Sequence, residues 1–407
     1  MEQVLYNLPD GWNYTELAAL CKFENGDRGR NYPSRDAFVE SGIPVINAGN
    51  LDGRKIVEAG LNYITRERYD ILGSGKVRNG DLLFCLRGSL GKCAIVSNLS
   101  EGAIASSLVI VRPSEALDPN YLLYYFNSSL CSSFIERYNN GSAQPNLSAK
   151  SLSKFLIPLV PIEKQKCIVE KLDALLTRID TAIEHLQGSI TLTDALSKSS
   201  LSEIFDGLKN CYEVVPLSSV VKINSGIALP QLFKNGFSDG DIPFFKVAQM
   251  NNHHENMIEP EITFNEKIAK EHKIKLFPKG STLIPKRGGA ILTNKKRVLL
   301  EDASYDSNIM GLKADEAKIA DDYLFAFMRT IDLANFVDAS TIPQVNNKHI
   351  DQMQIPLASQ AEQAKVVNRV DSLVKKVEAM NFEIKNQLND LLALKNSILD
   401  SAFKGEL

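Results

Sequence analysis

Two stretches of the chain place apolar residues at alternating intervals of three and four, the spacing of a helix that pairs along one seam. The first seam consists of Val169, Leu172, Leu176, Ile179, Ile183, Leu186 and Ile190. The second consists of Val367, Val370, Val374, Val377, Ile384, Leu388 and Leu391, with Asn381 in one core slot. No proline interrupts residues 162–215 or 357–407. The pattern predicts two long helices that pair as a coiled coil, in which the polar core residue helps to fix the register.

The remaining segments carry shorter apolar runs bounded by glycine or proline, which predict buried strands. These runs are Val45–Ile46, Leu82–Leu86, Leu108–Val111, Phe244–Phe245, Thr282–Ile284 and Val298–Leu300. Two further segments, Asn120–Phe134 and Asp322–Phe336, are predicted helices whose first turns Asp118 and Asp321 could cap. Together these patterns predict an α+β fold.

The chain is an internal repeat. Ile157-Pro158-Leu159 recurs 198 positions later as Ile355-Pro356-Leu357, and Leu201, Phe205 and Gly207 recur as Leu399, Phe403 and Gly405. Earlier segments correspond more loosely, as in Ile43-Pro44 with Ile242-Pro243. We therefore predict four parts: a domain over 1–158, a helix over 159–209, a second domain over 210–356 and a second helix over 357–407. The two copies would be related by a pseudo-twofold axis, with antiparallel helices and Leu407 close to Met1.

Composition is that of a soluble globular protein, with 44% hydrophobic and 23% charged residues among 407. This excludes global disorder. No apolar run approaches the roughly 20 residues that span a bilayer, and the N-terminus lacks the pattern of a signal peptide. We expect a cytoplasmic protein without membrane contact, whose six cysteines remain reduced thiols.

Charge is unevenly distributed along the chain. The net charge is −3, which argues mildly against a nucleic-acid-binding protein. From Lys267 to Arg297, however, ten basic residues face a single acid, Glu271, which gives this stretch a net charge of +9. The corresponding stretch of the first copy, Arg66 to Lys92, has six basic and three acidic residues. Because neutralising phosphates requires such clusters, the stretch favours contact with DNA or RNA.

Arg87 and Arg287 are the leading candidates for base contacts, because each ends an apolar strand just before a glycine and arginine commonly reads guanine. The alternative is that each pairs with a local carboxylate. Amide side chains precede the long helices; they could read adenine, or the asparagines among them could serve as ordinary turn and cap residues. Further amides and one lysine follow the Ile-Pro strands. Basic residues of the two positively charged stretches are also candidates for contact with DNA. The remaining DNA-binding candidates are Asn47, Asn50, Lys92, Gln144, Asn146, Lys246, Gln249, Lys286, Lys295, Lys296, Arg297, Gln344, Asn346 and Asn347.

Signatures of catalysis are not found in the sequence. Gly88 to Cys93 lacks the spacing and hydroxyl of a phosphate-binding loop, and no glycine-rich turn follows an early strand as in dinucleotide or S-adenosylmethionine folds. The five histidines have no partners at zinc-ligand spacing. We therefore expect no catalytic residues, no metal and no cofactor of the chain's own.

The order domain, helix, domain, helix resembles the specificity subunit of type I restriction–modification enzymes. The resemblance covers the whole chain and is carried by Ile157 through Gln165, Ile355 through Gln363 and the two helix ends. A departure is Ser359-Gln360-Ala361 in the second copy, where the first has Pro161-Ile162-Glu163.

This resemblance implies a non-catalytic subunit whose two target-recognition domains each read half of a split, asymmetric site in double-stranded DNA. It also implies helices that dock methyltransferase (modification) subunits, and restriction/translocase subunits that join them. Those partners would use S-adenosylmethionine, ATP and Mg²⁺. Two other functions are compatible with the sequence: a protein-assembly scaffold with two ligand-binding domains, and a fused nuclease–specificity chain, for which the length leaves little room.

Overall fold

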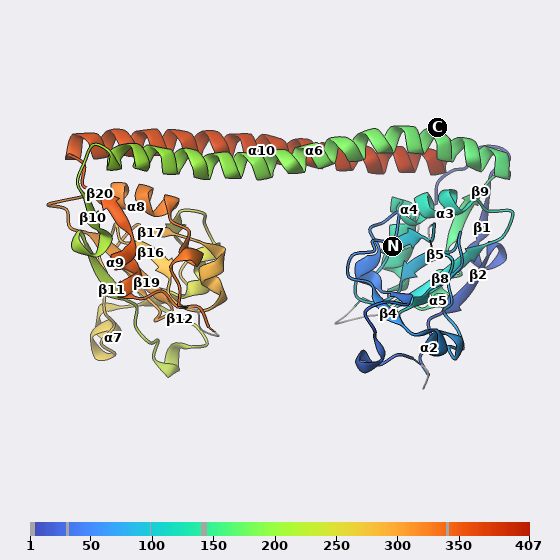
Figure 1. The fold of residues 1–407 in the computed structure, drawn as a ribbon, viewed down its shortest axis with the longest axis horizontal. Helices are drawn as coiled ribbons and strands as arrows, with labels where there is room; N and C mark the ends of the chain where they lie inside the picture. Colours follow the sequence, from blue (N-terminus) through green and yellow to red (C-terminus); the bar gives the residue numbers. More distant parts are fainter. Residues whose placement is uncertain (1–4, 30–31, 98, 140–144, 339–341) are drawn as a thin grey trace. The chain divides into compact units, whose positions relative to one another are not determined.

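The computed structural model describes residues 5–29, 32–97, 99–139, 145–338 and 342–407. The chain divides into two compact units, Met1–Gln187 with Lys385–Leu407, and Gly188–Ile384. Each unit contains one mixed domain of helices and strands together with a segment of both long helices, α6 (Ile162–Lys209) and α10 (Gln360–Lys404) (Figure 1). We call the part of unit 1 before α6 domain 1, and the part of unit 2 between α6 and α10 domain 2.

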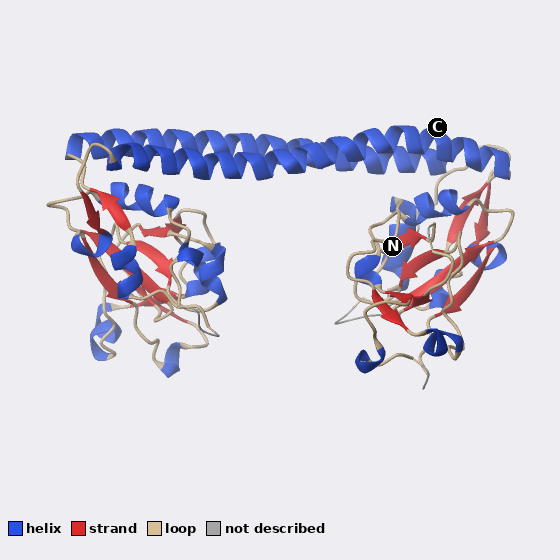
Figure 2. Cartoon of the chain, in the orientation of Figure 1, coloured by secondary structure: helices blue, strands red, loops and turns tan. Residues whose placement is uncertain are grey.

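Domain 1 is built on two small sheets (Figure 2). An antiparallel sheet has the order β2-β8-β5-β6, with β2 Cys21–Asn25, β8 Leu108–Pro113, β5 Leu82–Cys85 and β6 Cys93–Ile95. A second sheet has the order β4-β3-β7, with β4 Asn62–Ile64, β3 Ile43–Ile46 and β7 Ala103–Ile104. Strand β1 (Asn13–Glu16) pairs with β9 (Leu156–Leu159). The helices are α1 Leu17–Leu20, α2 Arg66–Asp70, α3 Pro119–Phe126, α4 Ser129–Tyr138 and α5 Ala149–Leu152.

Domain 2 repeats this plan with larger sheets. One has the order β11-β19-β16-β17-β14, with β11 Val221–Ser225, β19 Ile309–Ala314, β16 Thr282–Pro285, β17 Arg297–Leu299 and β14 Asn256–Met257. The other has the order β12-β15-β13-β18, with β12 Phe237–Asp239, β15 Ile262–Phe264, β13 Ile242–Phe245 and β18 Ser304–Tyr305. Strand β10 (Val214–Pro216) pairs with β20 (Gln354–Pro356). The helices are α7 Glu266–Glu271, α8 Asp321–Thr330 and α9 Asn347–Gln352. All six strands predicted from apolar runs are present.

The predicted helices of the domains are shorter than expected. The run 120–134 divides into α3 and α4, because Ser128 caps a new helix by accepting a hydrogen bond from the Cys131 N–H. The run 322–336 ends at Thr330 and is followed by a 3₁₀ turn at Leu333–Asn335. Asp118 caps α3 as predicted. The prediction for Asp321 was wrong, because this residue lies inside α8 and pairs with Lys313.

Each domain packs against the end of the helix that belongs to the other copy. In unit 1, the ring of Phe403 at the end of α10 lies 5.2 Å from that of Tyr121. In unit 2, Phe205 near the end of α6 lies 5.6 Å from Tyr323. All four rings are buried. The repeated leucine and phenylalanine at the helix ends, Leu201 with Phe205 and Leu399 with Phe403, therefore anchor each helix in the hydrophobic core of a unit.

The long helices pair in antiparallel fashion within each unit. In unit 1, the Lys395 Nζ lies 2.6 Å from the Asp180 carboxylate. In unit 2, the Asn381 Nδ2 donates to Asp194 Oδ1 at 3.0 Å. In each unit the end of one helix shares a hydrophobic core with the start of the other, Phe403 with Leu172 in unit 1 and Phe205 with Val367 in unit 2, so the two helices run antiparallel. The prediction of antiparallel partners is confirmed.

The N-terminal segment and the end of α10 lie together in unit 1. The Lys404 Nζ is 5.0 Å from the centre of the Tyr6 ring, and a side chain at Gly405 would collide with Pro9. The predicted proximity of Leu407 to Met1 itself lies outside the described residues, which begin at Leu5. Within the described ranges, no helix is long and apolar enough to cross a membrane. All six cysteines are free thiols.

Candidate nucleic-acid interface

The two strand-end arginines occupy equivalent, exposed positions. Arg87 follows β5 and Arg287 follows β16, and the next residue in each case is a glycine with φ of +75° or +79°. This left-handed conformation favours glycine. In the described parts of the chain, neither guanidinium has a carboxylate within ion-pair distance. The alternative of a local carboxylate partner is therefore not supported.

Each arginine lies beside an amide residue from a distant segment. Arg87 forms an isolated antiparallel bridge with Asn146, and Arg287 forms one with Gln344. The bridges are held by matching backbone bonds, from the Leu147 N–H to the Leu86 carbonyl at 2.9 Å and from Val345 to Lys286 at 3.0 Å. The structure thus joins two candidate regions that the sequence placed about 60 residues apart.

The neighbours of these bridges vary in accessibility. Lys92 is exposed on the hairpin between β5 and β6, and Asn347 is exposed at the start of α9. The Lys286 Nζ donates to the Ser225 hydroxyl at 3.1 Å. Asn346 caps α9, and its Nδ2 donates to the Asp338 carboxylate at 3.0 Å. Gln144, also predicted to bind DNA, lies outside the described residues.

Two amides that follow the Ile-Pro strands, Asn50 and Gln249, have structural roles inside the domains, and their surroundings do not support the predicted contact with DNA. Asn50 and Gln249 are each 2% exposed. Asn50 Oδ1 accepts from the Asn47 N–H at 3.1 Å, and Gln249 Oε1 accepts from the Lys246 N–H at 2.7 Å. Each amide nitrogen donates to a carbonyl of the following loop. Every polar atom that could read a base is therefore already bound inside the domain.

The two residues beside these amides are also engaged within the domains. Asn47 Oδ1 accepts from the Gly49 N–H at 2.8 Å. The Lys246 Nζ lies 3.0 Å from the Glu261 carboxylate. The Asn47 oxygen and the Lys246 ammonium group are therefore already partly engaged within their domains.

Two residues of the basic run from Lys295 to Arg297, Lys296 and Arg297, face the interior of domain 2, whereas Lys295 is half-buried. Lys296 is 7% exposed, and its Nζ donates to Asn294 Oδ1 at 2.7 Å and to the Ile331 carbonyl. Burial lowers the pKa of Lys296 to about 7. The Arg297 Nε donates to the Met250 carbonyl at 2.8 Å, and burial lowers the pKa of this guanidinium as well. The Lys295 Nζ bonds Asn251 Oδ1. Lys296 and Arg297 cannot reach a phosphate without local unfolding.

The exposed part of the basic stretch lies around α7. We call this group the α7 lysines: Lys267, Lys270, Lys273, Lys275 and Lys279, all of which are exposed. Among the described residues, the only ion pair that these ammonium groups form is that of Lys270 with Glu266, at 4.0 Å. The Asp302 carboxylate accepts from the Lys279 backbone N–H at 2.8 Å. In unit 2, α7 lies on the side of domain 2 away from α6 and α10 (Figure 1). These lysines contribute to the net charge of +9, but none of them is among the DNA-binding residues predicted from the sequence.

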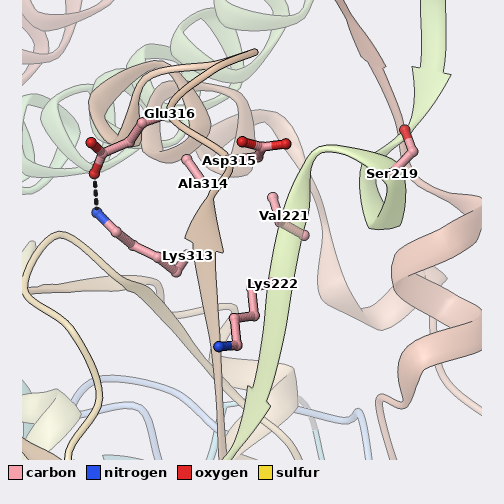
Figure 3. A pocket seen from close by; sticks show the side chains of 7 residues that line it. All are labelled: Ser219, Val221, Lys222, Lys313, Ala314, Asp315 and Glu316. Atoms are coloured by element: carbon pink, nitrogen blue, oxygen red, sulfur yellow. Dashed lines mark hydrogen bonds and ion pairs between the residues drawn. The ribbon is translucent and has the colours of Figure 1, made fainter.

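The hollows on the surface do not indicate a catalytic centre. One hollow in domain 2, of about 580 Å³, is lined by Ser219, Val221, Lys222, Lys313, Ala314, Asp315 and Glu316 (Figure 3). Its Lys313 is 2.8 Å from Glu316 and also pairs with Asp321. Across the described ranges, no group of three His, Cys, Asp or Glu residues could hold a metal ion.

The comparisons with known proteins agree with the predicted architecture. Residues 9–191 and 210–390 match the family described as type I restriction modification DNA specificity domain. The specificity subunit of the type I restriction enzyme StySPI from Salmonella potsdam is 23% identical over 98% of this chain and 90% of its own length. The specificity subunit of the EcoKI enzyme from Escherichia coli (strain K12) is 22% identical over the same shares.

A solved structure has the same fold. It is described as the structural basis underlying complex assembly and conformational transition of the type I R-M system. Its matching chain has a TM-score of 0.75 and 21% identity, over 99% of this chain and all of that one. This likeness confirms the predicted α+β fold with two domains and two long helices. One matched region falls on each copy of the repeat, and the chain therefore belongs to the family of type I restriction–modification DNA specificity domains.

Proposed function

We propose that each domain reads one half of a two-part, asymmetric site in double-stranded DNA. Membership of the specificity family gives the chain a role in DNA recognition rather than catalysis. The observation that carries the finer proposal is the pair of equivalent bridges, Arg87 with Asn146 and Arg287 with Gln344. Two readers with the same framework but different side chains would recognise two different half-sites, and the combined site would not be palindromic.

The side chains suit two kinds of contact. Arg87 and Arg287 would donate to the edge of a guanine, while Asn146 and Gln344 could read adenine. The α7 lysines would contact phosphates, which supply affinity for any sequence and make it dependent on salt. This division assigns sequence discrimination to the bridges and general affinity to α7.

The experiment that tests the proposal uses binding titrations on duplexes in which one half-site at a time is scrambled. Arg87→Ala should weaken recognition of one half-site, and Arg287→Ala that of the other. If each arginine reads a guanine, each loss should be about 1–3 kcal/mol. Arg178→Ala and Arg369→Ala, exposed on the long helices, serve as matched controls and should change neither. An equal loss at both half-sites for either mutant would contradict the assignment.

The helix pair would dock the methyltransferase and restriction/translocase subunits. In unit 2, Leu192 on α6 is 71% exposed and Phe382 on α10 is 67% exposed, while Thr193 and Asn381 occupy the buried side. We propose that these exposed apolar side chains belong to the surface that the partner subunits cover. S-adenosylmethionine, ATP and Mg²⁺ would bind to those subunits and not to this chain. A DNA-modifying complex of this kind would work in the cytoplasm.

Co-purification with the methyltransferase subunit tests the docking surface. Leu192→Glu with Phe382→Glu should reduce the amount of methyltransferase retained, because two charges would be buried at the interface. Binding of the isolated chain to DNA should be unchanged. Ser199→Glu, on an exposed position of the same helix, is the matched control. Full retention of the methyltransferase by the double variant would exclude this surface.

A further inference from the structure

Two loop residues of opposite charge occupy the same place in the two domains. The Ile95 N–H donates to the Arg54 carbonyl at 3.0 Å, and the Val298 N–H donates to the Glu255 carbonyl at 2.8 Å. Ile95 and Val298 themselves pair with Leu82 and Thr282, the first residues of β5 and β16. Arg54 in domain 1 is therefore the structural equivalent of Glu255 in domain 2.

Two aspartates are equivalent on the long helices. Asp173 on α6 and Asp371 on α10 each lie eight residues after a buried glutamine, Gln165 or Gln363. Gln165 Oε1 accepts from the Asp118 N–H at 2.8 Å, and Gln363 Oε1 accepts from the Ala320 N–H at 2.9 Å. Both glutamines thus fasten the start of a helix to its own domain, and both aspartates follow at the same level.

In unit 1 the loop arginine binds the helix directly. The Arg54 Nη2 is 2.7 Å from Asp173 Oδ1, and the same nitrogen donates to the Tyr124 hydroxyl at 2.7 Å. Tyr124, on α3, also donates to Asp173. The guanidinium carbon lies 5.2 Å from the centre of the Tyr124 ring. One aspartate of α6 therefore holds both the loop and α3 of domain 1.

In unit 2 the arginine comes from a different element. The Arg329 Nη1, at the end of α8, is 2.8 Å from Asp371 Oδ1, and its Nε is 3.0 Å from Glu255 Oε1. The Arg329 side chain is 13% exposed. Without it, Glu255 and Asp371 would be unpaired carboxylates in the same neighbourhood. The reversal of charge in the loop is thus compensated by a new cation in α8.

The residue equivalent to Arg329 in domain 1 is Asn127. Tyr121 and Tyr323 are equivalent, since their hydroxyls donate to the Pro158 and Pro356 carbonyls at 2.8 and 2.9 Å. Asn127 and Arg329 each follow six residues later. The Asn127 Nδ2 donates to the Gly53 carbonyl at 3.0 Å and so holds the same loop without a charge. Two divergent domains therefore reach one arrangement, an arginine on the helix aspartate, by different sequences.

We infer that these domain–helix ion pairs, Arg54–Asp173 and Arg329–Asp371, are positioning contacts that set the angle of each domain on its helix segment. The inference rests on the proposed two-part reading of DNA. Apolar packing around Phe403 and Phe205 is non-directional and holds each domain at its distance from the helix. A charge-assisted hydrogen bond also depends on angle, and it can therefore fix rotation. Rotation of either domain would change the gap, that is, the number of base pairs between the two half-sites, at which both half-sites can be read together.

The test compares two measurements on the full chain. A selection from duplexes with random spacers defines the preferred gap, and titrations on duplexes with one half-site scrambled measure each domain by itself. Asp371→Ala and Asp173→Ala should each broaden the range of accepted gaps. Affinity for the preferred gap should fall about 3- to 10-fold, while binding to the half-site read by the affected domain stays within about twofold.

Rescue separates a positioning role from a folding role. The charge exchange Arg54→Asp with Asp173→Arg should restore the narrow gap preference that Arg54→Asp alone loses. Asp390→Ala, an exposed aspartate on α10, is the matched control and should leave the gap unchanged. Thermal unfolding of each variant shows whether the units remain folded.

The outcomes are distinguishable. A two-part site with an unchanged gap distribution in both aspartate variants would overturn the inference alone. If binding to the half-site and to the two-part site falls equally, and the charge exchange does not restore it, the ion pairs serve only to keep the domain folded. This result would also overturn the inference. A wild-type selection that returns no two-part site would overturn the proposed function, and the inference with it.

Discussion

Burial divides the ten basic residues between Lys267 and Arg297 into groups with different roles. The α7 lysines are exposed, whereas Lys296 and Arg297 bond to carbonyls inside domain 2. A count of charges along the sequence treats the two groups alike. The two groups should nevertheless behave differently. An exposed ammonium group can neutralise a phosphate, whereas burial disfavours the charged form of the side chain.

The α7 lysines should control how DNA binding depends on salt. A triple variant combines Lys270→Ala, Lys273→Ala and Lys275→Ala. Its affinity for DNA of every sequence should fall. The slope of log affinity against log salt concentration should flatten by about 0.9 for each phosphate that is no longer neutralised. Titrations at several salt concentrations measure this slope. Lys376→Ala, exposed on α10, is the control. A slope equal to that of the wild type would exclude α7 from the interface.

Lys296 should make the stability of unit 2 depend on pH. Its pKa is about 7 in the folded chain and about 10.4 when unfolded. Between these values the unfolded state binds more protons, so the free energy of unfolding rises with pH. Relative to Lys296→Met, the wild type should therefore gain stability from pH 7 to pH 10, by an amount on the order of a few kcal/mol.

Urea unfolding of both proteins at the two pH values checks this prediction. Lys275→Met, at an exposed site, is the control. Its free energy of unfolding should differ from that of the wild type by the same amount at both pH values. A difference between wild type and Lys296→Met that does not change with pH would mean that Lys296 stays charged in the folded chain.

At the scale of the helices, the polar core slot of the pair has a defined partner. The Asn381 Nδ2 donates to Asp194, but in the described structure Asn381 Oδ1 is buried without a hydrogen-bond partner. An unsatisfied buried acceptor costs stability. The register defined by Asn381 and Asp194 is thus maintained at the expense of a less stable core.

Asn381→Leu should raise the free energy of unfolding of the chain by about 1–3 kcal/mol, because it removes the unsatisfied oxygen and adds apolar contact. Chemical denaturation followed by circular dichroism measures the change. Asn386→Leu, at an exposed position of the same helix, should have little effect. Lower stability for Asn381→Leu would mean that the bond to Asp194 contributes more than the unsatisfied oxygen costs.

At the scale of the whole molecule, the order of the copies should be open to circular permutation. Because Lys404 and Tyr6 lie together in unit 1, a short linker can join the two ends of the chain. New ends between Lys209 and Cys211 would then fall just after α6. The permuted chain should fold, bind the same two-part site and unfold at a similar temperature. Loss of folding, measured by circular dichroism, would contradict this prediction.

The length of the helix pair should set the number of unread base pairs. The observed register places Leu186 opposite the segment after Leu388 rather than after Ile384, so matched insertions belong after Leu186 and after Leu388. Four residues at each site add about 6 Å and keep the seam nearly in phase. The preferred gap should lengthen by about one or two base pairs, with reduced affinity because the duplex also rotates. An unchanged gap in a random-spacer selection, with the helices intact, would contradict the prediction.

The sequence by itself determined the features that depend on periodicity and repetition. The seams of α6 and α10, the apolar strands and the offset of 198 all follow from local spacing, and they predicted the fold, the antiparallel pairing and the family. The equivalence of Arg87 and Arg287 was also visible, because a strand end followed by glycine is a local pattern.

Only the tertiary structure decided which polar residues face solvent. Asn50 and Asn146 are both asparagines near predicted loops, yet the first is enclosed by carbonyls and the second lies beside Arg87. Lys296 and Lys273 belong to one basic run, yet one is buried and the other exposed. Accessibility depends on contacts between segments far apart in the chain, and these contacts leave no periodic signal. The ion pairs of Asp173 and Asp371 could not be predicted from the sequence either, because their arginines occupy different positions in the two copies.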